Sequence, residues 1–194
     1  MQIIDNFLDD KNFLLLKTHL ESMDFPWFYI PTVSLPPGAV ITDPLAKETF
    51  GYNHIAYDCE TENKSFFFPA LTNILIAFED RFQQRIKKLL RARLSVKHPK
   101  IGFTKDNYNL PHVDYFSPHS TLIYYINDSD GDTMIFNEVF DEAAGGEPSE
   151  FSIKTRVTPK ANRMLYLENG YQYHTASNPI STDRRIILNI NLIV

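Results

Sequence analysis

Cysteine is almost absent from this sequence, since Cys59 is the only one among 194 residues. A single thiol cannot form an internal disulfide, so the fold does not depend on an oxidising compartment. Long hydrophobic runs are also missing, because no segment approaches the roughly 18–20 apolar residues that span a bilayer. Met1 is not followed by the basic and apolar regions of a secretory signal. We therefore expect a soluble, cytoplasmic protein with no membrane partner.

Positive charge is in short supply as well. The formal net charge is −5, so bulk electrostatics does not favour binding to a polyanion, although a local basic patch is not excluded. The chain also lacks the glycine-rich loop that cradles phosphates and the nucleophile elbow of Ser/His/Asp hydrolases. These absences argue against a nucleotide-binding protein and against a serine hydrolase.

Aromatic residues, in contrast, are plentiful and make up 13% of the chain. Large planar side chains pack well on the half-buried face of a sheet, so this composition favours a β-rich core. The length suits one domain with a sizeable core. We expect a single domain over residues 1–194, in which residues 1–97 supply supporting helices and N-terminal strands and residues 98–194 form the β core.

The first half of the chain shows few strand signals. A short strand is expected at Gln2–Ile4 and a helix near 9–21, which Asp9 or Asp10 could cap. Residues 31–49 are rich in proline and threonine, which is typical of a loop.

The clearest helical pattern runs from about Pro69 to Leu90, with Pro69 suited to the first turn. Apolar residues recur there at steps of three and four, which is one face of an α-helix. They are Leu71, Leu75, Phe78, Phe82, Ile86 and Leu89. We interpret this segment as a helix that braces a sheet; the alternative is a stripe that binds a partner.

After Arg91 the pattern changes to short β-like runs separated by turn residues. The runs are 93–97, 100–104, 120–126, 133–136, 150–158, 163–167, 173–176 and 185–194. About eight strands of this length predict a sandwich or jelly roll, and the N-terminal helices would then cover one sheet.

One group of residues suggests a metal centre. His112 and Asp114 are two positions apart, so in an extended segment both side chains point to the same side. His174 belongs to a later predicted strand. Two imidazoles and one carboxylate form the ligand set of a non-haem Fe(II) centre with open coordination positions. A His-x-Asp pair alone is weak evidence, because His112 could equally be a surface loop histidine.

The neighbouring residues strengthen this hypothesis. A tyrosine-rich strand, Ile123–Asn127, follows the pair, and then comes the turn Gly131-Asp132-Thr133. After His174 the last strand begins with Arg184 and Arg185. In this order, the features of residues 98–194 resemble the Fe(II)/2-oxoglutarate-dependent dioxygenases, specifically the prolyl-4-hydroxylase-like branch. That branch has a second glycine where this chain has Asp132, which leaves the turn geometry open.

The resemblance implies a mainly-β α+β fold, a double-stranded β-helix (jelly roll) with supporting N-terminal helices. It implies Fe(II) held by His112, Asp114 and His174, with 2-oxoglutarate as cosubstrate, O2 as oxidant and ascorbate as a candidate reductant. The implied reaction hydroxylates a C–H bond and releases succinate and CO2. A peptide or protein is favoured over a small molecule or nucleic acid as substrate, with a peptidyl prolyl residue as first candidate. The oligomeric state is open.

The resemblance also implies residues that bind 2-oxoglutarate. A basic residue after the distal histidine would pair with the 5-carboxylate, and both Arg184 and Arg185 are candidates. Arg185 is favoured, because its side of the strand continues with Asn189 and would turn polar groups inward. Asn189 is then a further pocket residue. Tyr125 takes the place of a strand tyrosine that bonds the same carboxylate; alternatively, it is a core tyrosine.

Two other interpretations stay open at this stage. The chain could be a non-catalytic jelly-roll binding module that carries the motif without using it. It could also be a cupin-like metal protein, although cupins usually show a His-x-His pair, and this sequence has none.

Overall fold

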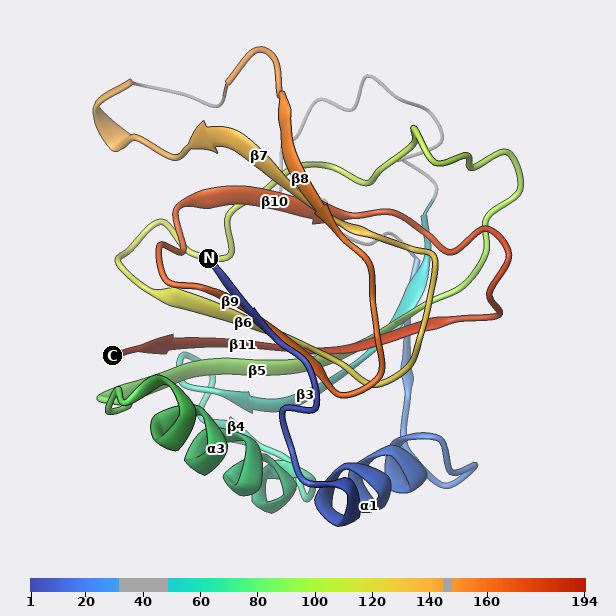
Figure 1. Cartoon of the computed structure of the whole chain (residues 1–194), viewed down its shortest axis with the longest axis vertical. Coiled ribbons are helices and arrows are strands. Elements are labelled where there is room, and N and C mark those ends of the chain that lie inside the picture. The colour runs from blue at the N-terminus through green and yellow to red at the C-terminus, as the bar shows by residue number, and fades with distance from the viewer. Residues whose placement is uncertain (32–48, 145–147) are drawn as a thin grey trace.

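The computed structural model describes residues 1–31, 49–144 and 148–194. The expected loop at 31–49 therefore lies almost entirely outside the described residues. Within them, strands form two antiparallel sheets that face each other, and two α-helices cover the outer face of the larger sheet (Figure 1). This is the mainly-β jelly roll with supporting helices that the sequence predicts.

The larger sheet carries most of the strands. Its order is β1 (Gln2–Ile4), β9 (Arg163–Leu167), β6 (Ser120–Tyr125), β11 (Arg185–Ile193), β5 (Lys88–Lys97), β3 (Gly51–Asp58) and β2 (Phe28–Ile30), with β4 (Asn63–Lys64) paired to β3. The smaller sheet has the order β10 (Gln172–Ala176), β7 (Thr133–Val139) and β8 (Ile153–Val157). A short 3₁₀ turn, η2 (Glu142–Ala144), follows β7.

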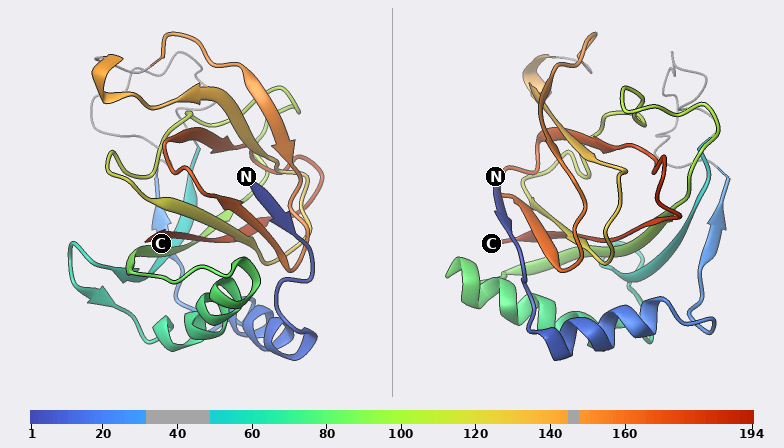
Figure 2. Two further views of the ribbon diagram at one scale, coloured as in Figure 1. Left: turned by 60° about the vertical axis from the view of Figure 1, so that its left-hand side comes forward. Right: turned by 45° about the vertical axis from the view of Figure 1, so that its right-hand side comes forward.

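The helices lie together beneath the larger sheet, as both views of Figure 2 show. Helix α1 (Asp10–Leu20) begins after Asp9, whose carboxylate accepts a hydrogen bond from the backbone N–H of Asn12 at 3.0 Å. This N-cap satisfies an amide that has no partner within the helix. The predicted first strand and first helix are thus confirmed.

The second helix is shorter than the sequence pattern predicts. The 3₁₀ turn η1 (Phe68–Leu71) leads into α3 (Thr72–Phe82), and Gln83 then ends it in the left-handed region at φ 53°. The prediction of a helix to Leu90 was wrong, because residues 88–97 form β5, which pairs with β11 on one side and β3 on the other. A central strand gains ladder hydrogen bonds at both edges, and these outweigh the helical spacing of Ile86 and Leu89.

Two strand predictions also need correction. Residues 100–104 form a turn, in which the Phe103 N–H donates to the Lys100 carbonyl at 3.1 Å and Gly102 adopts φ 87°. Strand β3 was not predicted, because its buried positions do not alternate cleanly and so lack a period-two signal. Both β3 and β5 precede residue 98, so the larger sheet draws on both predicted parts of the chain; the division at 97 stays a prediction.

The larger sheet has an apolar face and a polar face. On the helix side, alternate residues of β11 join the main apolar core, which also contains Tyr124. On the side that faces the smaller sheet, β11 presents Arg185, Ile187, Asn189 and Asn191, and Tyr125 lies on this side too. The space between the sheets is where polar side chains gather.

Candidate metal and cosubstrate site

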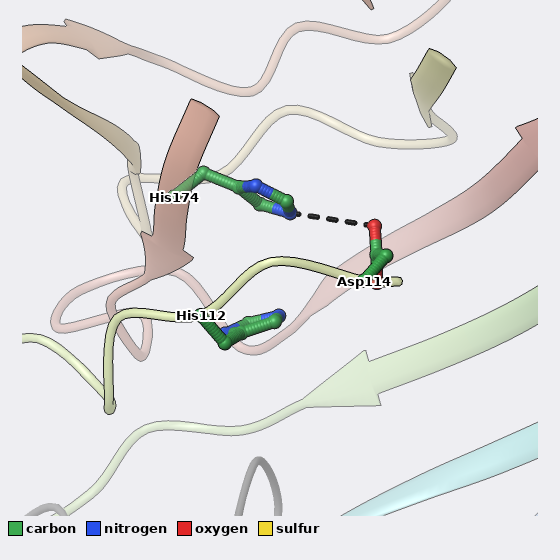
Figure 3. A group of neighbouring side chains, drawn as sticks. All are labelled: His112, Asp114 and His174. Carbon is green, nitrogen blue, oxygen red and sulfur yellow. Dashed lines mark ion pairs between the residues drawn. The ribbon is translucent and has the colours of Figure 1, made fainter. Parts of the chain in front are cut away.

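The three predicted metal ligands converge between the two sheets. His174 lies on β10, and the backbones of His112 and His174 exchange two hydrogen bonds of 3.0 Å, which hold the loop of His112 beside that strand. The candidate ligand atoms of His112, Asp114 and His174 lie within 4.8 Å of one another. Figure 3 shows the three side chains pointing toward a common point, with His174 Nε2 at 3.5 Å from Asp114 Oδ2.

Backbone carbonyls orient both imidazoles. His112 Nδ1 lies 3.0 Å from the Leu110 carbonyl and His174 Nδ1 lies 3.1 Å from the Gln172 carbonyl. Because a carbonyl only accepts, each Nδ1 carries the proton, and in the neutral ring each Nε2 carries a lone pair. His174 Nε2 is buried, and among the described residues its one polar contact is the 3.5 Å approach to Asp114 Oδ2, which is too long and strained to satisfy it fully. This arrangement is the one that a metal-binding histidine pair needs.

Asp114 is held by donors from three strands. Its Oδ1 lies 2.9 Å from Arg91, and its Oδ2 accepts from Asn191 at 2.9 Å and from Thr121 and Asn189 at 3.2 Å. Burial alone would raise the pKa of Asp114, but the His174 contact and the charges of the histidines and Arg91 hold that pKa well below its usual range. The carboxylate is therefore ionised and ready to bind a cation.

The surroundings shift the pKa values of the two histidines in opposite directions. Burial lowers the pKa of His112 to about 4. Burial also acts against the charged form of His174, but the Asp114 carboxylate outweighs it and raises the His174 pKa. A cation placed among the three groups would replace the proton that His174 otherwise shares with Asp114. Two neutral nitrogens and one carboxylate fit Fe(II) and leave coordination positions open.

The two candidate arginines point in different directions. Arg184 lies outside, where its guanidinium pairs with Glu21 at 3.1 Å and its side chain is 46% exposed. Arg185 is 2% exposed and lines the same cavity as His112 and His174. Its Nε donates to the Gly131 carbonyl at 2.8 Å and its Nη2 to Thr133 Oγ1 at 2.7 Å. Strand alternation thus leaves Arg185 as the arginine that faces the cavity.

Gly131 shapes this end of the cavity. A Cβ on Gly131 would lie 2.9 Å from Pro179 N, 3.0 Å from the Ser177 carbonyl and 3.1 Å from Arg185 Cδ. Only glycine lets the turn approach Arg185 so closely. Asp132 in the next position leaves this contact intact.

Of the two other residues predicted to bind 2-oxoglutarate, Asn189 lines the cavity and Tyr125 lies behind its wall. The Tyr125 hydroxyl is 2.7 Å from Thr133 Oγ1, and the Arg185 guanidinium lies 5.7 Å from the centre of its ring. Tyr125 is not among the residues that line the cavity. Asn189 does line it, and its amide donates to Asp114. The predicted role of both residues in binding 2-oxoglutarate stays a prediction.

The sequence reading missed several cavity residues on β5. The cavity has about 500 Å³ of empty space, its open mouth included. It is lined by Arg93, Ser95, Lys97, His112, Ile123, Thr133, His174, Thr175, Ala176, Arg185, Ile187 and Asn189. A signal was present in the sequence, since Arg91, Arg93, Ser95 and Lys97 alternate along β5. Their spacing places four polar side chains on one face of a strand.

Comparison of the sequence with protein-family models and with curated proteins gives no match. Solved structures do match. The α-ketoglutarate-dependent epimerase SnoN from nogalamycin biosynthesis aligns with a TM-score of 0.61 at 14% identity, over 98% of this chain and 77% of that one. A prolyl hydroxylase from Trichoplax adhaerens, solved with a hypoxia inducible factor peptide, gives 0.60 at 13% identity over 99% and 82%.

A third match is a 2OG-Fe(II) oxygenase family oxidoreductase from Burkholderia pseudomallei, with a TM-score of 0.60 at 11% identity over 98% and 83%. The fold is therefore the double-stranded β-helix of Fe(II)/2-oxoglutarate oxygenases, and it carries a His-x-Asp…His triad. At these identities the likeness does not single out the prolyl-hydroxylase branch. No helix among the described residues is long and apolar enough to cross a membrane.

Proposed function

We propose that this protein is an Fe(II)- and 2-oxoglutarate-dependent dioxygenase that hydroxylates a C–H bond. One observation carries the proposal: a single cavity is lined by two of the candidate metal ligands, His112 and His174, and by the buried cation Arg185. Asp114 completes the ligand set and is fixed by hydrogen bonds from Asn189 and Asn191. The fold shared with known oxygenases supports the same conclusion.

Each group has a separate task. His112, Asp114 and His174 would hold Fe(II), which together with 2-oxoglutarate supplies O2 activation and C–H oxidation with release of succinate and CO2. Arg185 would bind the distal carboxylate through the guanidinium donors that its hydrogen bonds to Gly131 and Thr133 do not use. Lys97 is the register partner of Arg185 and adds a second cation at this end.

A peptide or protein is the proposed substrate partner, with a prolyl residue as the first candidate. The similarity to a prolyl hydroxylase solved with a peptide supports this choice, although an epimerase matches equally well. Iron and fold do not determine the substrate, so the reaction must be tested on peptides, free amino acids and nucleosides side by side. Ascorbate enters these assays as an added reductant.

The test has two stages. Anaerobic addition of Fe(II) and 2-oxoglutarate should produce a visible charge-transfer band in the wild type and none in His112→Ala. Succinate release is then measured with the substrate panel, with His112→Ala as the blank. The absence of both the band and succinate, in protein shown to bind iron, would overturn the proposal in favour of a non-catalytic jelly-roll module.

A further inference from the structure

Strand β5 turns three cations toward the space between the sheets. Arg91, Arg93 and Lys97 alternate along it, and Arg93 and Lys97 line the cavity. Burying an unpaired cation is costly, so such residues usually have an anionic partner. The partners of these three side chains therefore show what the cavity has evolved to hold.

One of the three cations has an anionic partner in the protein, and a second lies where the proposed cosubstrate would supply one. Arg91 is paired with Asp114 at 2.9 Å. Lys97 is the register partner of Arg185, so these two residues lie together at the end proposed for the distal carboxylate of 2-oxoglutarate. The pKa of Lys97 lies well below its usual range, first because the amine is buried and second because the positive charges of Arg185 and Arg93 are near.

Arg93 has no such partner. No hydrogen bond or ion pair joins its guanidinium to any residue in the described ranges, and its Nε is buried and unsatisfied. The side chain as a whole is only partly buried, so the rest of the guanidinium is accessible from the cavity that it lines. An unsatisfied buried donor of this kind costs free energy unless a ligand completes it.

Arg93 also lies level with the metal ligands. Its register partner on β11 is Asn189, which donates to Asp114. Arg93 lines the same cavity as His112 and His174. A group bound by Arg93 would therefore lie beside the metal and four register positions along the strands from Lys97 and Arg185.

Filling the proposed site does not remove the imbalance. Even with Lys97 neutral, Fe(II), Arg91, Arg93 and Arg185 would bring five positive charges, against three negative charges from Asp114 and 2-oxoglutarate. Asp114 acts on Arg93 through its charge but makes no hydrogen bond to it, and it is already paired with Arg91. A further anion must come from outside the protein or from the substrate itself.

We propose that Arg93 is a specificity-determining residue that binds a carboxylate of the substrate beside the iron, so that this enzyme acts on carboxylic acids. The inference rests on the proposed function and adds the substrate class. A carboxylate suits the site because one guanidinium offers one positive charge and a planar pair of donors that matches two coplanar oxygens. A phosphate monoester would bring close to two negative charges to a single cation. The carboxylate could belong to a free acid or to an acidic residue of a peptide.

The experiment compares matched acids and amides. Protein is held with Mn(II) and saturating 2-oxoglutarate without O2, so that the cosubstrate site is full and no turnover occurs. The melting temperature is then followed against small carboxylic acids, N-acetyl amino acids and acidic tripeptides, each paired with its primary amide. Phosphate monoesters of similar size form a further arm. The variants are Arg93→Met, Arg93→Lys and, as a matched exposed control, Arg156→Met.

We expect at least one acid to raise the melting temperature where its amide does not. Arg93→Met should lower the affinity for that acid by about 10–100-fold, the usual effect of losing a charged hydrogen bond. Arg93→Lys should retain part of the affinity, and Arg156→Met should leave it unchanged. The affinity for 2-oxoglutarate should be the same in wild type and Arg93→Met. Whether free acids or peptides bind identifies the source of the carboxylate.

Any of three results overturns the inference: no acid binds better than its amide, phosphate monoesters bind better than all acids, or Arg93→Met lowers the affinity for 2-oxoglutarate. Failure of the proposed function is read separately, from the missing charge-transfer band with Fe(II). The acid-over-amide preference is also measured in metal-free protein, so it can survive or fail independently of that band.

Discussion

The guanidinium of Arg91 lies 2.9 Å from Oδ1 of Asp114 and joins the start of β5 to a loop that has no strand partner at this point. The Asp114 side chain is 1% exposed, and that of Arg91 is 20% exposed. Asn191 completes the support by donating to Oδ2 and by accepting from Arg91 at 3.1 Å. The position of the acidic candidate ligand thus depends on residues that are far from it in the sequence.

Arg91→Met should therefore weaken metal binding. The loss of an outer group that orients a metal ligand typically costs about 10–100-fold in affinity. The measurement is a calorimetric titration of Mn(II) into metal-free protein, with Arg81→Met on α3 as control. An unchanged dissociation constant for Arg91→Met, in folded protein, would show that the amides of Asn189 and Asn191 suffice to hold Asp114.

The adjacent arginines form a matched pair for testing the cosubstrate end. Arg185→Met should raise the dissociation constant of 2-oxoglutarate by about 10–100-fold, because a buried charged hydrogen-bond donor is lost. Arg184→Met removes only an exposed pair with Glu21 and should leave that constant unchanged. Titration of the charge-transfer band with 2-oxoglutarate measures both. Equal effects of the two substitutions would contradict the assignment of Arg185 to the cavity.

Gly131→Ala should lower both the affinity for 2-oxoglutarate and the stability of the fold, with the larger effect on the affinity. The new methyl group would meet Arg185 Cδ at 3.1 Å and the neighbouring backbone at 2.9–3.0 Å, so either the turn or the arginine has to move. We expect a destabilisation of about 1–3 kcal/mol, typical of overpacking, together with a higher dissociation constant for 2-oxoglutarate. Metal affinity serves as the internal control, because the triad is supported elsewhere. A loss of stability with unchanged cosubstrate binding would show that Arg185 does not move.

Lys97→Met should stabilise the protein in the absence of ligands. Burial and the charges of Arg185 and Arg93 lower the Lys97 pKa in the folded state below the usual 10.5. Between the folded pKa and 10.5 the unfolded chain binds more protons, so the free energy of unfolding of the wild type rises with pH across that window. Removing the cation should add about 1–3 kcal/mol near neutral pH and flatten this rise.

Urea unfolding of wild type and Lys97→Met, near neutral pH and again near the usual lysine pKa, measures the effect. The gap between the two proteins should shrink as pH rises. The same variant should bind 2-oxoglutarate less tightly, which is the expected trade-off between stability and function at a site that buries charge. A variant that is less stable than wild type at both pH values would mean that Lys97 has an acidic partner.

The row of cations on β5 is a feature of the site that is visible in the sequence but was not predicted to belong to the site. Arg91, Arg93 and Lys97 alternate as a strand requires, but Leu89 and Ile86 also continue the helical spacing of α3. Local spacing alone cannot choose between the two, because the choice depends on whether β11 and β3 are available as pairing partners. Residues 93–97 were predicted to form a strand, but local spacing does not show which face of a strand turns toward the metal ligands, because that depends on the pairing of β5 with β11 and β3.

The sequence by itself determined the chemistry on offer: the types of the three metal ligands, the trailing arginines, and the period-two runs that build a jelly roll. Those features are local, and short-range sterics and side-chain chemistry suffice to interpret them. Only the tertiary structure decided that Arg185 turns inward while Arg184 pairs with Glu21, that Arg91 holds Asp114, and that Arg93 is left with a buried, unpaired donor. These outcomes depend on strand register and on contacts between distant segments, where the burial of charge is settled by the whole fold.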